Sequence, residues 1–263
     1  MDKLKKKRLY LLDMDGTIYL GDRIFDGTLE FLDYIKQIGG KYMFLTNNSS
    51  KSVERYVEKV NKMGIKATTD DFFTSTNATV IYLKQKLRKK IYALGTKAFK
   101  EQLIAANLNI CDTLQSDIDC LCMGFDTELT FSKLEDACKL LKNDIEYIAT
   151  NPDWVCPTEY GYVPDCGSVS EMLFKATGKR PYFIGKPKPD MINLAIKESG
   201  FSKEEAVIIG DRLYTDIASG INAGISTVFV LSGEGTLDDI KTMDIHPEYI
   251  FENVLTLYKD LIC

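Results

Sequence analysis

Apolar runs of strand length alternate along most of this chain with amphipathic runs of helix length. Such alternation is typical of a parallel sheet covered by helices. The N-terminal part reads as strand, helix, strand, helix and strand, at residues 8–14, 28–38, 41–46, 53–63 and 72–73. The C-terminal third repeats the pattern at residues 182–185, 189–199, 206–210, 216–222 and 227–231. The sequence therefore predicts an α/β fold with a Rossmann-like parallel sheet.

The middle of the chain has an alternation of its own. Its expected strands are residues 91–94, 118–124 and 147–149, and its expected helices are 97–106, 132–142 and 168–177. A stretch of about 100 residues is long enough to fold as an independent unit. We therefore predict a core domain of residues 1–79 and 181–263, with an α/β domain of residues 80–180 inserted into it.

Composition excludes several classes of protein. The formal net charge is −5, and no basic patch interleaved with aromatic residues marks a nucleic-acid surface. No apolar run approaches the roughly 20 residues of a membrane span, and no signal peptide is apparent. The seven cysteines are an odd number and lie mostly in apolar segments, which favours reduced, buried thiols. We expect a cytoplasmic protein without nucleic-acid or membrane partners.

Two carboxylates stand two residues apart where the first expected strand ends. They belong to the run Asp13-Met14-Asp15-Gly16-Thr17, in which glycine allows a sharp turn. The carboxyl ends of parallel strands are where ligands bind in open sheets. A solvated turn would use the same residue types, so this run alone does not decide between a site and a turn.

Three further polar groups follow in order, each at a predicted strand end. Thr46-Asn47-Asn48-Ser49-Ser50 offers hydroxyls, amides and backbone N–H groups to a phosphate. Lys186 stands between a strand end and a helix start, a place that favours an anion. Asp211 and Asp216 form a second acidic pair after an apolar strand. Each group alone has an ordinary explanation, as loop, surface charge or helix cap.

Together these groups predict a divalent-metal and phosphate site at one edge of the sheet. Mg²⁺ prefers oxygen ligands and is commonly held by one or two carboxylates plus a substrate phosphate. A metal also reduces the repulsion between an anionic nucleophile and an anionic phosphate. A carboxylate can itself attack phosphorus and form an aspartyl-phosphate.

As a set, these motifs resemble those of the haloacid dehalogenase (HAD) superfamily of phosphatases. The motif positions are Asp13 to Thr17, Thr46, Lys186, and Asp211 with Asp216. The inserted segment, with Thr150-Asn151-Pro152-Asp153 and with Thr177-Gly178 leading into Gly185-Lys186-Pro187, is similar to the α/β cap of the NagD and p-nitrophenyl phosphatase branch. The resemblance covers essentially the whole chain.

The resemblance implies a role for each matching position. Asp13 is the expected nucleophile and a Mg²⁺ ligand, and Asp15 is the expected general acid and base, which also binds the metal through its backbone carbonyl. Asp211 is the expected third protein ligand, with Asp216 supporting the metal site. The resemblance further implies that Lys186 neutralises charge in the transition state, while Thr46 and the Asn47 amide hold the phosphoryl oxygens.

The resemblance also assigns substrate choice to the inserted cap, which closes over the site in relatives. The candidate contacts there are Phe125, Thr127, Asn151, Asp153, Trp154 and Cys156. One departure from the family pattern is Asp165, where relatives usually have glycine. We expect Asp165 either to adopt left-handed geometry or to change the loop near the cap hinge. Relatives with this cap often pair through it, so the resemblance implies a homodimer formed through the cap.

The expected reaction is Mg²⁺-dependent hydrolysis of small phosphomonoesters. The partner is then a small phosphorylated metabolite, such as a nucleoside monophosphate or a sugar phosphate, with p-nitrophenyl phosphate as a test substrate. A single histidine, His246, lies outside every motif, and neither a cysteine-phosphatase loop nor a P-loop occurs. A phosphomutase or phosphotransferase of the same superfamily and a non-catalytic phosphate-binding protein are the alternatives. The residues do not name the physiological substrate.

Overall fold

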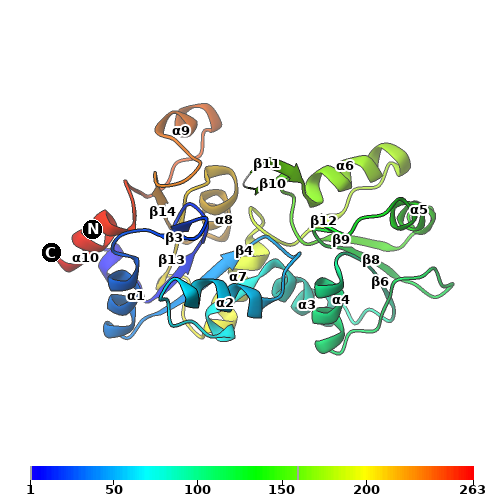
Figure 1. The fold of residues 1–263 in the computed structure, drawn as a ribbon, viewed down its shortest axis with the longest axis horizontal. Coiled ribbons are helices and arrows are strands. Elements are labelled where there is room, and N and C mark those ends of the chain that lie inside the picture. The colour runs from blue at the N-terminus through cyan, green and yellow to red at the C-terminus, as the bar shows by residue number, and fades with distance from the viewer. Residues whose placement is uncertain (1, 159) are drawn as a thin grey trace. The chain divides into compact units, whose positions relative to one another are not determined.

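The computed structural model describes residues 2–158 and 160–263 and divides them into two compact units. The core unit contains the chain up to Thr46, then Val53–Phe73 and Lys186–Cys263. The inserted unit contains Asn47–Ser52 and Thr74–Gly185. Both are α/β in character, with helices beside a sheet of parallel strand pairs (Figure 1).

The core unit is built on a six-stranded sheet of order β15-β14-β13-β1-β4-β5. The strands are β1 (Leu9–Leu12), β4 (Lys41–Thr46), β5 (Phe72–Thr74), β13 (Ala206–Gly210), β14 (Ser226–Val230) and β15 (Tyr249–Phe251). Every residue of β1, β13 and β14 is buried. Strands covered on both faces favour apolar side chains, which is why β1 and β13 read as continuous apolar runs. The register places β1 between β13 and β4, in parallel with both.

Helices of the core unit, apart from α9 (Leu237–Met243), bury apolar side chains. The others are α1 (Thr28–Gln37), α2 (Val53–Lys62), α7 (Pro189–Ser199), α8 (Ala218–Ala223) and α10 (Val254–Ile262). Phe31 on α1 meets Tyr10 of β1 edge-on, with ring centroids 5.7 Å apart. Helices α1 and α10 pack beside each other, and Val254, Leu257 and Leu261 of α10 enter the same apolar cluster. This packing fixes the sheet whose strand ends carry the polar motifs.

The inserted unit has a five-stranded sheet of order β12-β9-β8-β6-β7. Its strands are β6 (Ile91–Leu94), β7 (Ile110–Cys111), β8 (Cys120–Met123), β9 (Glu146–Ala149) and β12 (Tyr182–Phe183). Its helices are α3 (Ser75–Gln85), α4 (Lys97–Ala105), α5 (Phe131–Leu140) and α6 (Cys166–Thr177). A separate antiparallel hairpin joins β10 (Val155–Thr158) to β11 (Gly161–Pro164).

The structure divides the chain at positions that differ from the predicted 79/80 and 180/181. Strand β12 was expected in the core, but it pairs in parallel with β9 of the inserted sheet. The backbone N–H groups of Ile184 and Gly185 continue this pairing, at 3.1 and 2.8 Å from the carbonyls of Ala149 and Thr150. The inserted unit therefore extends to Gly185, and it also takes in Asn47–Ser52 and the start of α3.

Asp165 does not take up the left-handed geometry that was one of its two expected outcomes. Its φ is −109°, and it is the N-cap of α6, where its side chain accepts a hydrogen bond from the Cys166 N–H. Aspartate is a favoured N-cap because its carboxylate satisfies a backbone donor of the first helical turn. The substitution for glycine thus fits an ordinary helix start.

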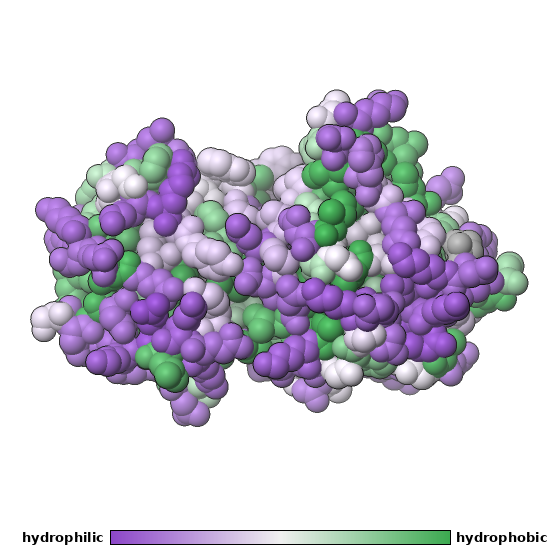
Figure 2. All heavy atoms as spheres, turned by 180° about the vertical axis from the view of Figure 1, so that it is seen from behind, coloured by the Kyte–Doolittle hydropathy of each residue, from purple (hydrophilic) through white to green (hydrophobic). Residues whose placement is uncertain are grey.

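Several elements have no counterpart among the predicted ones. They include the helix α3, the hairpin of β2 (Tyr19–Leu20) and β3 (Arg23–Ile24), the β10–β11 hairpin, β7, and the C-terminal run of α9, β15 and α10. Hydrophilic residues dominate the face seen in Figure 2, with smaller hydrophobic areas between them. In the described part of the chain, no helix combines the length and the apolar character that crossing a membrane requires.

Candidate active site

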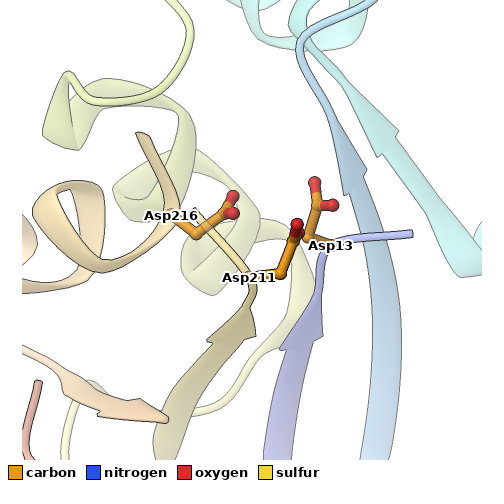
Figure 3. A group of neighbouring side chains, drawn as sticks. All are labelled: Asp13, Asp211 and Asp216. Atoms are coloured by element: carbon orange, nitrogen blue, oxygen red, sulfur yellow. The ribbon is translucent and has the colours of Figure 1, made fainter. Parts of the chain in front are cut away.

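Three carboxylates of the core unit point toward one another where neighbouring strands end (Figure 3). Asp13 follows β1, and its N–H donates to the carbonyl of Ile209 on β13 at 2.9 Å, so the two strand ends are held side by side. Asp211 follows β13 directly, and Asp216 lies in a π-helical turn at Leu213–Ile217. One oxygen from each carboxylate lies within 4.8 Å of the others. Asp13 of the first motif therefore meets both acids of the second.

Lys186 places its ammonium between two of these carboxylates. Its Nζ lies 2.7 Å from Asp13 Oδ1 and 2.6 Å from Asp216 Oδ1, and it donates to the Leu45 carbonyl at 3.4 Å. Burial alone lowers the pKa of a lysine, but Asp13 and Asp216 outweigh it and raise the pKa of Lys186 above its ordinary value. The lysine is therefore charged, and it compensates two of the acids.

Asp211 and Asp216 are both buried, at 1% and 0% exposure. Burial raises the pKa of each carboxyl, and the neighbouring Asp13 raises it further. Three clustered carboxylates thus carry more negative charge than the Lys186 ammonium alone offsets. A divalent cation coordinated by oxygen would remove this repulsion, so the donor set fits a metal such as Mg²⁺.

Asp15 lies near the cluster on the turn after β1. Partial loss of water around its carboxyl raises the pKa of Asp15. The residue as a whole is nevertheless exposed to solvent. Its backbone forms an isolated bridge to Tyr19. The structure thus presents Asp15 beside Asp13 on a turn of fixed shape.

Gly16 and Thr17 bring this turn against Asp211. Gly16 has a φ of +87°, and a methyl group built on it would overlap the Asp211 carboxylate. The buried Thr17 hydroxyl donates to Asp211 Oδ1 at 3.3 Å. Glycine is needed here both for the left-handed backbone and for the close approach.

Thr46 and Asn47, which were predicted to bind phosphate together, belong to different units. Thr46 is the buried last residue of β4 in the core unit. Asn47 belongs to the inserted unit, where its Nδ2 donates to Asp153 Oδ2 at 3.1 Å. Their joint phosphate-binding role stays a prediction.

The candidate substrate contacts of the inserted unit fall into different surroundings. Asn151 is fully buried, and its Nδ2 donates to Asp153 Oδ2 at 3.2 Å and to Asp165 Oδ1 at 3.1 Å. Phe125 is buried in an apolar cluster of the unit. The remaining candidates reach the surface to different degrees: Thr127 and Trp154 are exposed, and Cys156 is half-buried. The structure thus brings Asn151 and Asp153 together with Asn47. Phe125 is linked to the same unit's loop through its backbone N–H, which donates to Ser49 Oγ at 2.8 Å.

A loop that the sequence analysis did not single out also contacts the carboxylate cluster. It comprises Ser232–Gly235 and follows β14. The Glu234 N–H donates to Asp211 Oδ2 at 2.8 Å. The available signal for this loop was the run Ser-Gly-Glu-Gly after an apolar strand. That strand, β14, pairs in parallel with β13, so both end at the same edge of the sheet.

Comparison with known proteins shows the family to which this chain belongs. Residues 10–109 match a sequence family described as haloacid dehalogenase-like hydrolase, and residues 183–257 match one described as HAD-hydrolase-like. An acid sugar phosphatase of Staphylococcus aureus is 35% identical over 252 residues, which cover 95% of this chain and 96% of that protein.

Solved structures superpose over nearly the whole chain. A 4-nitrophenylphosphatase from Thermotoga maritima has a TM-score of 0.92 at 39% identity, covering 98% of both chains. A glycerol phosphate phosphatase from Mycobacterium tuberculosis, crystallised with calcium, has a TM-score of 0.90 at 27% identity, covering 97% of this chain and 76% of that one. The chain therefore belongs to the haloacid dehalogenase-like hydrolase family, in its NagD and p-nitrophenyl phosphatase branch.

Proposed function

We propose that this chain is a Mg²⁺-dependent phosphatase that hydrolyses small phosphomonoesters through an aspartyl-phosphate on Asp13. The observation that carries the proposal is the cluster of Asp13, Asp211 and Asp216 with the Lys186 ammonium between two of them. An anionic nucleophile can approach an anionic phosphate only where positive charge offsets the repulsion. Lys186 supplies part of that charge.

The acids of the cluster would hold the metal. Asp13 and Asp211 would bind it through carboxylate oxygens and Asp15 through its backbone carbonyl, with Asp216 in support. When bound, Mg²⁺ would supply positive charge that orients and neutralises the phosphoryl oxygens. Thr17 and the Glu234 N–H, which donate to Asp211, would fix the direction of that carboxylate.

In the first half-reaction, a carboxylate oxygen of Asp13 attacks phosphorus, and the bond from phosphorus to the leaving oxygen breaks. Asp15 gives its proton to that oxygen, so an alcohol departs. The Lys186 ammonium, 2.7 Å from Asp13 Oδ1, stabilises the charge that develops between nucleophile and phosphoryl group.

In the second half-reaction, water attacks the phosphorus of the aspartyl-phosphate. Asp15, now a carboxylate, takes a proton from the water, and the bond between phosphorus and the Asp13 oxygen breaks. Inorganic phosphate and the Asp13 carboxylate are the products, so both aspartates return to their starting states.

Small organic phosphates are the proposed substrates. The names of the relatives support this class: an acid sugar phosphatase, a 4-nitrophenylphosphatase and a glycerol phosphate phosphatase. We further propose that the inserted unit selects among such compounds, with Asn151, Asp153 and the exposed Trp154 as the first residues to test.

The proposal is tested by measuring phosphate release from p-nitrophenyl phosphate, sugar phosphates, glycerol phosphate and nucleoside monophosphates, with Mg²⁺ or with EDTA. We expect turnover with Mg²⁺, loss of it in EDTA, and at least about a 1000-fold loss in Asp13→Asn. Unchanged rates in that variant would rule out Asp13 as the nucleophile. Transfer of the phosphoryl group to a second organic molecule instead of water would identify a phosphomutase or phosphotransferase.

A further inference from the structure

The carboxylate of Asp211 is held by a loop that is remote in sequence. The Glu234 N–H donates to Asp211 Oδ2 at 2.8 Å, and the Gly235 N–H donates to the Asp211 backbone carbonyl at 3.0 Å. The Thr17 hydroxyl donates to the other carboxylate oxygen at 3.3 Å. Both oxygens of Asp211 therefore have a fixed donor.

Close packing makes this arrangement sensitive to the position of the loop. A methyl group built on Gly233 would overlap the Asp211 carboxylate, as one on Gly16 would. The Ser232 hydroxyl donates to the Gly16 carbonyl at 2.7 Å, which joins the loop to the turn after β1. Asp211 thus sits between two glycine-containing segments that are tied together.

The side chain of Glu234 is anchored to the segment that carries Asp211. Its Oε2 lies 2.9 Å from Arg212 Nε, and its Oε1 accepts a hydrogen bond from the Tyr214 hydroxyl at 3.0 Å. Arg212 and Tyr214 follow Asp211 by one and three residues. A closed ring of contacts therefore runs from Asp211 through Arg212 or Tyr214 to the Glu234 side chain, and through the Glu234 N–H back to Asp211.

The ring borders a hollow rather than the apolar core. Arg212, Tyr214 and Glu234 line a cavity of about 210 Å³ together with Asp239 and Met243 of α9. Tyr214 is 43% exposed, and the Glu234 side chain is exposed to the same degree. Exposed polar contacts of this kind contribute little to the stability of the fold. Stabilisation of the core therefore does not explain why Glu234 contacts Arg212 and Tyr214.

We propose that Glu234 is a positioning residue, which keeps the Asp211 carboxylate turned toward Asp13 and Asp216 for metal binding. The inference rests on the proposed function, in which Asp211 is a Mg²⁺ ligand. The Glu234 side chain fixes the 232–235 loop, and the loop N–H fixes the carboxylate. Residues that hydrogen-bond to metal ligands commonly orient those ligands, and their removal weakens metal affinity by about 10- to 100-fold.

The test is a titration of the thermal unfolding temperature with Mg²⁺, which reports binding without turnover. Glu234→Ala is expected to weaken Mg²⁺ binding by about 10- to 100-fold. Tyr214→Phe is expected to weaken it by at most about 5-fold, since it removes one hydrogen bond. The double variant is expected to match Glu234→Ala, because both substitutions act on one ring of contacts.

The matched control is Asp238→Ala, which removes an acid of equal charge from the exposed start of α9. It is expected to bind Mg²⁺ like the wild type. Arg212 is left unchanged, because its charge also acts on Asp13. If Glu234→Ala does not fold, Tyr214→Phe and Glu234→Gln decide, because the first removes the hydroxyl that donates to Glu234 and the second removes the charge that faces Arg212, with little change in side-chain size.

The outcomes separate this inference from the proposed function. Wild-type affinity in all the Glu234 and Tyr214 variants would overturn the positioning role and leave the metal site in place. Additive losses in the double variant would also overturn it. A wild-type protein that Mg²⁺ does not stabilise would overturn the proposed metal site itself, and the inference with it.

Discussion

Lys186 Nζ lies 2.6 Å from Asp216 Oδ1, and both side chains are almost completely buried, at 3% and 1% exposure. The same ammonium lies 2.7 Å from Asp13 Oδ1. A buried charge is tolerated only when it is paired, so the lysine and the two acids depend on one another. The pairing has a structural consequence besides its proposed part in catalysis.

Replacing Lys186 by methionine is expected to destabilise the protein as well as to abolish activity. Asp13 and Asp216 would lose their shared cation, and removing one partner of a buried pair typically costs about 3–5 kcal/mol. Urea unfolding in EDTA measures this loss. The exposed Lys66 provides the control, since Lys66→Met should change stability by no more than about 0.5 kcal/mol. Equal stabilities for the two variants would contradict the pairing.

Gly16→Ala is expected to impair Mg²⁺ binding through a steric conflict with Asp211. The new methyl group would overlap that carboxylate, and the backbone there has a φ of +87°. Gly21 isolates the backbone effect, because its φ is +59° and nothing lies within 4 Å of an added carbon. Gly21→Ala should therefore cost only about 1–2 kcal/mol of stability and keep the metal affinity. Metal titrations of both variants measure the difference in Mg²⁺ affinity. Equal affinities would show that overlap with the Asp211 carboxylate does not impair metal binding.

Mg²⁺ is expected to raise the unfolding temperature of the wild type, and EDTA is expected to reverse this. A ligand present at about 100 times its dissociation constant stabilises a folded protein by roughly 2.7 kcal/mol. Asp211→Asn should lose most of the effect, because an amide in place of the carboxylate removes charge from the cluster. Calorimetric titration checks the same point directly. Undiminished stabilisation in Asp211→Asn would remove that residue from the ligand set.

The sequence predicted those strands and helices in which burial determines the residue types. The runs of β1 and β13 are apolar throughout, and that of β4 is apolar between Lys41 and Thr46, because both faces of the sheet are covered; polar residues begin where these strands end. The expected meeting of Asp13 with Asp211 followed from the parallel order of the strands. The helix at 189–199 was found as predicted, with proline in its first turn and glycine after its end.

Contacts that depend on tertiary pairing could not be predicted in this way. Strand β12 has only two residues, so nothing local shows that it pairs with β9 rather than with the core. The run at 232–235 indicates a loop after an apolar strand, but Glu234 meets Asp211 because β14 lies beside β13, and the local sequence does not show which strands are neighbours. For Asp165, the helix start that decides its geometry was placed at residue 168 instead of 166.

The cysteines are expected to divide into protected and reactive thiols. Cys120, Cys122 and Cys166 are buried, and burial raises the pKa of each thiol, which keeps it in the unreactive protonated form. Cys263 is exposed and should react first. A thiol reagent that reports by absorbance, followed by peptide mapping, measures the order of modification. Fast labelling of Cys122 in the native protein would contradict the packing of the inserted sheet.

The most direct measurement is to trap the covalent intermediate. An acyl phosphate is reduced by borohydride to an alcohol, so an aspartyl-phosphate becomes homoserine, which peptide mass spectrometry locates. The enzyme, quenched during turnover with Mg²⁺ and then reduced, should contain homoserine at position 13. The Asp13→Asn variant and a sample in EDTA should contain none. Homoserine at a different aspartate, or none from an enzyme that turns over, would contradict the assignment of Asp13 as the nucleophile.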